Sequence, residues 1–265
     1  MSGGSGMSTV AVTTPARRMR ALARAELTLL GRNKGMLFAA LFVPMVVPFS
    51  TKQAAKDMDL AGTGLTVGTV VLPGALGFSL LFAVYSSLTA VYTARREELV
   101  LKRLRTGELR DPEILAGAAL PSVVIAAVQC LVLAAGCAAL LDAGAPNRPD
   151  LVVLGLAAGL VMFAALAAVT ASFSRSTESA QVMSLPLIFA SMVGSGLFVP
   201  LEVMPDKVAS VCELLPLTPV VELIRGGWAG GVSAGETFGA LATAVAWTLL
   251  AVFAVRRWFR WEPRH

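Results

Sequence analysis

The side chains that could take part in chemistry gather in one segment, residues 93–113, which reads TARREELVLKRLRTGELRDPE. It carries six lysines and arginines and five carboxylates, and long apolar runs lie on both sides of it. Charged side chains are costly in hydrocarbon, so this segment must lie in water or at a headgroup surface. It is either a surface that a partner contacts or a solvated connecting loop, and the residues by themselves leave both interpretations open.

The rest of the sequence is poor in catalytic groups. The single histidine is His265, and no Gly-Lys-Ser/Thr triplet occurs, which argues against a catalytic triad, a histidine-based zinc site and a P-loop on this chain. The three cysteines, Cys130, Cys137 and Cys212, are too few and too scattered for a disulfide framework, and we expect small buried side chains. We therefore expect no enzyme activity, no metal and no cofactor on this chain.

The composition predicts an all-α integral membrane protein. Hydrophobic residues make up 56% of the 265 residues and charged residues 15%, with a mean hydropathy of +0.73. Soluble domains carry about 25% charged residues. The apolar runs are unbroken rather than alternating and approach the length of about 20 residues that a membrane-spanning helix needs, which argues against a β-barrel.

The chain is expected to form one membrane domain, residues 15–265, after a flexible leader over residues 1–14. Six spans are predicted at about 35–53, 65–92, 114–141, 151–173, 180–200 and 237–255. Between the fifth and sixth spans, prolines divide the chain into two short helices, about 206–215 and 219–228, which we expect to re-enter the outer surface. Glu222 and Arg225 are three residues apart there and could pair on one helix face.

The distribution of positive charge predicts the orientation. With both termini in the cytoplasm, inner segments carry 17 of the 22 lysines and arginines, and outer segments carry five. This placement explains the net charge of +5 without a nucleic-acid partner. Residues 15–34 have the pattern of a basic amphipathic helix at the membrane interface, with Arg17, Arg20 and Arg24 together on one side.

The charged segment has the pattern of a short cytoplasmic helix joined to spans two and three. Glu98 and Lys102 are spaced for an ion pair one helical turn apart. Thr106-Gly107 is expected to end this helix, and Asp111 to cap the next one before Pro112. An apolar strip is expected along one side of the helix, made of Val100, Leu101 and Leu104.

Two stretches resemble ABC type-2 transporter permeases of the bacterial drug, lipid and polysaccharide exporter type. The first is ARREELVLKRLRTGELRDPEILAGAALPSV, and the second is SGLFVPLEVMPDKV followed by LLPLTPVVELIRG. Chain length, span count and the basic amphipathic start agree, so the resemblance extends over nearly the whole chain from about residue 15. One departure is local: the family usually has Gly-Thr where this chain has Leu99-Val100.

The resemblance implies an exporter half. A second permease copy or paralogue would complete the pathway for a hydrophobic or amphipathic substrate, and two cytoplasmic ABC ATPase subunits would bind ATP and Mg²⁺ and supply the energy. The bacterial cell membrane would be the location. The residues expected to couple the permease to the ATPase are Arg96, Glu97, Glu98, Leu101, Lys102, Arg103, Leu104 and Arg105.

The residues alone also allow a different class of membrane protein. An autonomous channel or an ion-coupled carrier would need no ATPase. The span centres contain no Asp, Glu, Lys or Arg, which disfavours an ion-coupled carrier because such proteins usually place an ionisable group there. Sodium sites built from backbone carbonyls keep that alternative alive.

Overall fold

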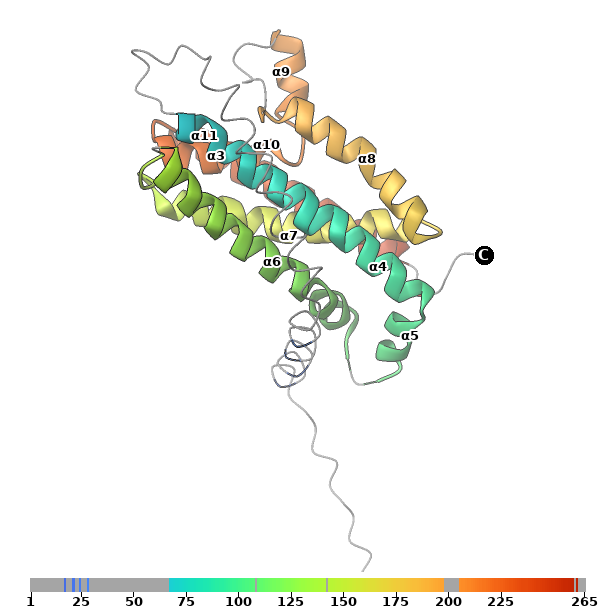
Figure 1. Cartoon of the computed structure of the whole chain (residues 1–265). Coiled ribbons are helices and arrows are strands. Elements are labelled where there is room, and N and C mark those ends of the chain that lie inside the picture. The colour runs from blue at the N-terminus through green and yellow to red at the C-terminus, as the bar shows by residue number, and fades with distance from the viewer. Residues whose placement is uncertain are drawn as a thin grey trace, which may run out of the picture.

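The computed structural model describes residues 67–259 apart from Glu108, Asp142 and residues 198–204, together with Trp261 and four positions near the N-terminus, Arg17, Ala21, Arg24 and Thr28. All regular structure in this part is helical (Figure 1). The elements are α3 (Val67–Ser79), the π-helix η1 (Leu80–Ser86), α4 (Ser87–Glu97), α5 (Val100–Arg105), α6 (Asp111–Leu140), α7 (Pro149–Phe173), α8 (Thr177–Gly194), α9 (Asp206–Cys212), α10 (Thr218–Ala229) and α11 (Ala234–Trp258).

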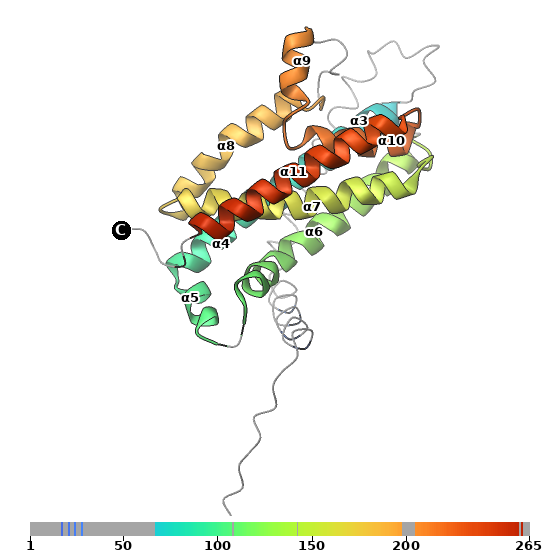
Figure 2. The same ribbon diagram turned by 180° about the vertical axis from the view of Figure 1, so that it is seen from behind.

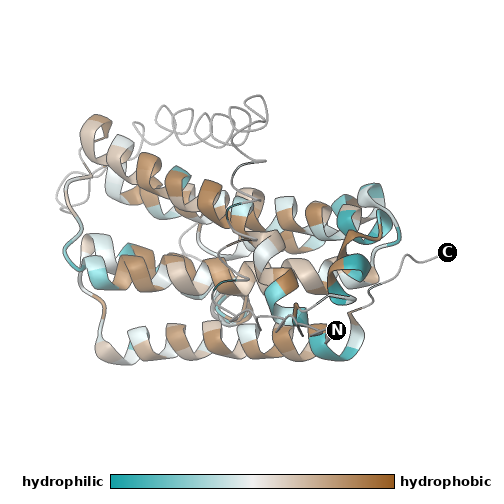
Figure 3. Cartoon of the chain, turned by 90° about the horizontal axis from the view of Figure 1, so that it is seen from below, coloured by the Kyte–Doolittle hydropathy of each residue, from teal (hydrophilic) through white to brown (hydrophobic). Residues whose placement is uncertain are grey.

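Among the described residues, four helices are long and apolar enough to cross a membrane. They are the continuous helix Val67–Glu97, which combines α3, η1 and α4, and the single helices α6, α7 and α11. They coincide with the second, third, fourth and sixth predicted spans. Hydrophobic residues dominate their middle turns, whereas hydrophilic residues gather toward the ends (Figure 3).

The other two predicted spans are not established in this way. The first, residues 35–53, lies outside the described residues, as does the leader. The fifth coincides with α8, whose 18 residues include Glu178, Gln181 and Pro186 and which is not one of the four long apolar helices. The six-span arrangement therefore stays a prediction.

Helix α7 lies at the centre of the bundle. It packs against α11 on one side and against η1 and α4 on another, while α6 flanks α3 and α8 flanks α4 (Figures 1 and 2). Its Gly155 and Gly159, which have the spacing of a helix contact face, meet α10 and η1. A Cβ at Gly159 would lie 2.7 Å from Leu80 Cδ1 and 3.1 Å from Val220 Cγ1, so a larger residue here would require these side chains to shift.

The two short helices predicted before the last span are present as α9 and α10. Helix α10 is packed among α7, α3 and α11, while its re-entrant position at the outer side of a membrane stays a prediction. Nine of its residues are buried, including Val220, Leu223, Ile224 and Trp228. The indole nitrogen of Trp228 donates a hydrogen bond to the carbonyl of Ala143 at 2.9 Å, which joins α10 to the connection between α6 and α7.

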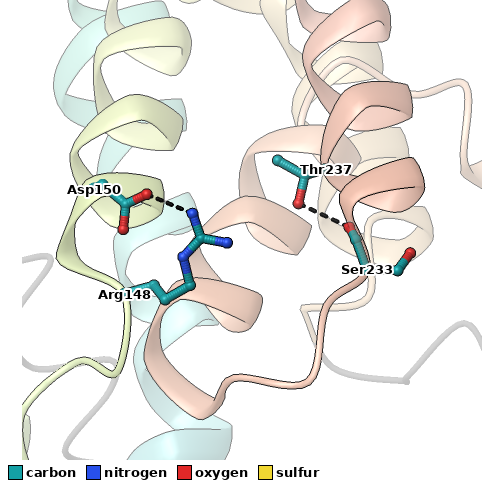
Figure 4. Close-up of polar contacts among 4 residues, drawn as sticks. All are labelled: Arg148, Asp150, Ser233 and Thr237. Carbon is teal, nitrogen blue, oxygen red and sulfur yellow. Dashed lines mark hydrogen bonds and ion pairs between the residues drawn. The ribbon is translucent and has the colours of Figure 1, made fainter.

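The two ends of the bundle differ in their polar contacts. We call the end where α4 finishes, α6 begins, α7 finishes and α8 begins the α5 end. At the opposite end, α7 and α11 begin beside one another (Figure 4). There Arg148 pairs with Asp150 at 2.7 Å, and the Thr237 hydroxyl donates to the carbonyl of Ser233 at 3.0 Å.

Inside the bundle, two pairs of hydroxyl groups join neighbouring helices. The Tyr85 and Thr170 hydroxyls lie 2.9 Å apart between η1 and α7, and Ser87 and Ser122 lie 3.1 Å apart between α4 and α6. The predicted burial of Cys130, Cys137 and Cys212 is confirmed, and all three are free thiols. Hydroxyl pairs of this kind hold membrane helices together at modest energy, about 1 kcal/mol each.

Candidate functional site

The charged segment folds into a break and a short helix rather than one continuous helix. Helix α4 ends at Glu97, and α5 begins at Val100 and has six residues. Between them Leu99 has φ 59° and ψ 15°, the left-handed conformation. Glu98 and Lys102 were expected to lie on one face of a single helix. That expectation is wrong, because the two residues lie on opposite sides of this break.

Leu99 stands where the resemblance places a glycine, and its backbone conformation is one that favours glycine. An L-residue with a side chain pays about 1–2 kcal/mol in the left-handed region, whereas glycine adopts it freely. The resemblance places a glycine at this position, and the backbone of this chain makes the turn that a glycine would make. Leu99 thus keeps the break instead of lengthening the helix, and its side chain is left 37% exposed.

Arg96 lies inside the bundle and not on the predicted contact surface. Its side chain is 0% exposed. Nη1 donates to the carbonyl of Ala171 at 2.6 Å, and Nη2 donates to the carbonyl of Ser174 at 2.5 Å. These carbonyls belong to the last turn and the cap of α7, where the helix leaves acceptors unsatisfied and carries partial negative charge. A partner could not touch Arg96 in this conformation, which corrects its expected role.

Glu97, the next residue, connects to the start of α8. The Thr177 hydroxyl donates to Glu97 Oε2 at 2.8 Å. Thr177 is the first residue of α8, which the Ser176 side chain caps by accepting from the backbone N–H of Ser179. In the same turn, hydrogen bonds from the Glu178 backbone N–H and from Ser176 hold the pKa of the Glu178 carboxyl below its usual value.

The side of α5 that faces solvent is largely basic. Leu101 is 0% exposed and anchors the helix to the bundle, so it too leaves the expected contact surface. Leu104 is partly buried. The exposed residues of the predicted coupling set are Glu97, Glu98, Lys102, Arg103 and Arg105.

Arg105 ties the end of α5 to two other parts of the chain. Its Nε lies 3.0 Å from Asp111 Oδ1 at the start of α6. Its guanidinium carbon lies 5.0 Å from the centre of the Trp261 ring, within the range of a cation–π contact. The C-terminal segment thus reaches the charged segment, a contact that the sequence pattern did not indicate.

The start of α6 differs by one residue from the prediction. Arg110, with extended backbone, is the N-cap, and Asp111 is the first helical residue. The Glu113 carboxylate accepts a hydrogen bond from the Arg110 backbone N–H at 2.9 Å. Asp111 is therefore free of the capping role and is placed to pair with Arg105.

The remaining predicted residues lie away from this site. Arg17 and Arg24 are helical and exposed, and Arg20 lies outside the described residues. Arg225 Nη2 donates to the carbonyl of Gly196 at 2.8 Å and so connects α10 to the end of α8. Its pairing with Glu222 stays a prediction. Among the described residues, no three His, Cys, Asp or Glu side chains group closely enough to hold a metal ion.

The comparison with known families decides the class. The sequence profile of the family described as ABC-2 type transporter matches residues 17–228. The chain belongs to the ABC-2 type transporter family. The matched residues of this ABC-2 transporter run from before α3 to one residue short of the end of α10 and so include the whole charged segment. The search of curated proteins finds no match.

Proposed function

We propose that the chain is the permease subunit of an ATP-driven bacterial exporter. Six spans with both termini in the cytoplasm of a bacterial cell would, with a second permease copy or paralogue, form the pathway. Two separate ABC ATPase subunits would bind ATP and Mg²⁺ and supply the energy. A hydrophobic or amphipathic substrate fits the apolar spans.

The observation that carries this proposal is the family match together with the exposed basic face of α5. The helix projects at the α5 end of the bundle, beyond the apolar turns of the four long helices (Figures 1 and 3). Lys102 and Arg103 are exposed on it, and Leu104 is only partly covered. A partly covered leucine beside exposed arginine is a composition suited to an interface, where arginine is enriched.

Introducing a negative charge on this face of α5 tests whether the ATPase docks there. In the complex with its cognate ABC ATPase, we expect Arg103→Glu or Leu104→Glu to reduce co-purified ATPase about tenfold, which corresponds to about 1.4 kcal/mol. The matched control is Lys207→Glu, an exposed cation on α9 at the opposite end of the bundle. Docking is elsewhere if the α5 variants retain as much ATPase as the Lys207 variant.

Reconstitution of the purified chain distinguishes an ATP-driven permease from an autonomous channel or ion-coupled carrier. The purified chain in liposomes, without ATP or ATPase, is expected to be inactive toward ions and small amphipathic dyes. Passive or ion-driven flux through the purified chain would identify an autonomous channel or carrier instead.

A further inference from the structure

One turn of α4 holds both sides of the connection between α7 and α8. Arg96 donates to two carbonyls at the end of α7, and Glu97 accepts from Thr177 at the start of α8. Both residues precede the Leu99 break and belong to the long helix that begins at Val67. The turn that carries α5 is thus fastened to two further helices.

The Arg96 contact is strong and directional. Its planar guanidinium presents two N–H groups in a fixed fork, and hydrogen bonds from a cation are about twice as strong as those between neutral groups. The side chain is fully buried, so water does not compete for either carbonyl. A rigid movement of this part of α4 must therefore displace the α7–α8 connection or break both bonds.

We propose that Arg96 is a positioning residue that carries movement of the charged segment to α7 and α8. This inference rests on the proposed function, because the movement would be driven by an ATPase docked on α5. Arg96 would not contact the ATPase. Glu97 and Thr177 form a second contact between α4 and the α7–α8 connection. This contact is weaker, since Glu97 is exposed and Thr177 is partly exposed.

Arg96→Lys tests the contact between α4 and the end of α7 separately from the charge of Arg96. Lysine keeps the charge and most of the length, but its single ammonium group cannot place two coplanar donors on the two carbonyls. Arg95→Lys is the matched control on the same turn, because Arg95 is only half-buried whereas Arg96 is fully buried. Thr177→Val removes the second contact with a side chain of equal shape and covers the case in which Arg96→Lys fails to fold.

The measurement is hydrogen–deuterium exchange on the full permease–ATPase complex in nanodiscs. ATPase binding is expected to slow exchange in residues 98–107 of the wild type and of all three variants, with co-purification within twofold. Addition of ATP–Mg²⁺ is expected to change exchange in residues 172–180 of the wild type and of Arg95→Lys. That ATP response should fall at least fivefold in Arg96→Lys and about twofold in Thr177→Val.

Three results would overturn the inference. The first is a full ATP response at residues 172–180 in both Arg96→Lys and Thr177→Val. The second is faster basal exchange there with an intact ATP response, since Arg96 would then only stabilise the fold. The third is loss of protection at residues 98–107 together with co-purification, which would place Arg96 in docking. By contrast, a wild type whose residues 98–107 are not protected by the ATPase would refute the proposed function itself.

Discussion

Replacement of Arg105 by glutamine should loosen α5 without disturbing the bundle. Arg105 makes two contacts that join α5 to the rest of the chain, one with Asp111 and one with Trp261. Glutamine removes both contacts and has nearly the same helix propensity as arginine. The effect should therefore report the anchoring of α5 and not its intrinsic helicity.

The free energy lost in Arg105→Gln depends on how exposed the two contacts are. The side chains of Arg105 and Asp111 are 51% and 45% exposed, so solvent and salt weaken their pairing to about 0.2–1 kcal/mol. An exposed cation–π contact adds about 0.5–1 kcal/mol. Together they amount to about 0.7–2 kcal/mol, which raises the local opening equilibrium of α5 by about 3-fold to 30-fold.

Hydrogen exchange of the permease in nanodiscs, without its partner, measures this opening directly. Residues 100–107 should exchange faster in Arg105→Gln by that factor, while the middle turns of α6 and α7 stay unchanged. Asp111→Asn and Trp261→Leu each remove one contact, and each should produce part of the change. The Asp111 variant also loses a carboxylate in the first turn of α6, so exchange in residues 112–116 is the control for that effect.

The anchoring would be disproved if Arg105→Gln left exchange in residues 100–107 unchanged. It would also be disproved if Trp261→Leu had no effect while Asp111→Asn reproduced the whole change, because the C-terminal segment would then contribute nothing.

Two further predictions concern packing and backbone conformation. Gly227→Ala should lower the thermal unfolding midpoint in detergent, because the new Cβ would lie 2.7 Å from Val152 Cγ2 and 2.9 Å from the Arg148 carbonyl oxygen, an overpacking cost of about 1–3 kcal/mol. Gly239→Ala in α11 meets no atom of another element within 4 Å of the added Cβ and should not lower the midpoint, because alanine is the better helix former. Equal midpoints for the two variants would refute the reasoning. Leu99→Gly should keep exchange in residues 98–107 near the wild-type rate, because relief of the left-handed cost offsets the added backbone freedom of glycine. Leu99→Val should speed exchange there, since a β-branched residue tolerates this conformation poorly, and a Val variant as protected as the Gly variant would contradict the assignment.

The long helices could be predicted from the sequence because their signal is local. Unbroken apolar runs place α6, α7 and α11 within three residues of the expected bounds at each end. The prolines before the last span likewise place α9 and α10. How deeply α10 is packed could not be predicted, because a moderately apolar segment with charges has the same composition whether it lies on a surface or between helices.

The position of the charged segment could be predicted from the sequence, but the burial of its individual side chains could not. Its six basic side chains look alike in a charge pattern, yet Arg96 is fully buried and Arg103 is exposed. What separates them is the end of α7, 75 residues along the chain, whose carbonyls accept from Arg96. A charge pattern also carries no sign of the turn at Leu99, since leucine is a strong helix former.

The length of the helix Val67–Glu97 has a mechanical consequence. Its 31 residues extend about 46 Å at 1.5 Å per residue, whereas the hydrocarbon layer is about 30 Å thick. A helix this much longer than the hydrocarbon layer crosses it tilted or extends beyond it. At its start the helix is joined to the end of α6, where the Gly68 N–H donates to the Leu141 carbonyl at 3.0 Å. The wider turns of η1 lie midway along it, and π-helical turns are among the places where long helices bend.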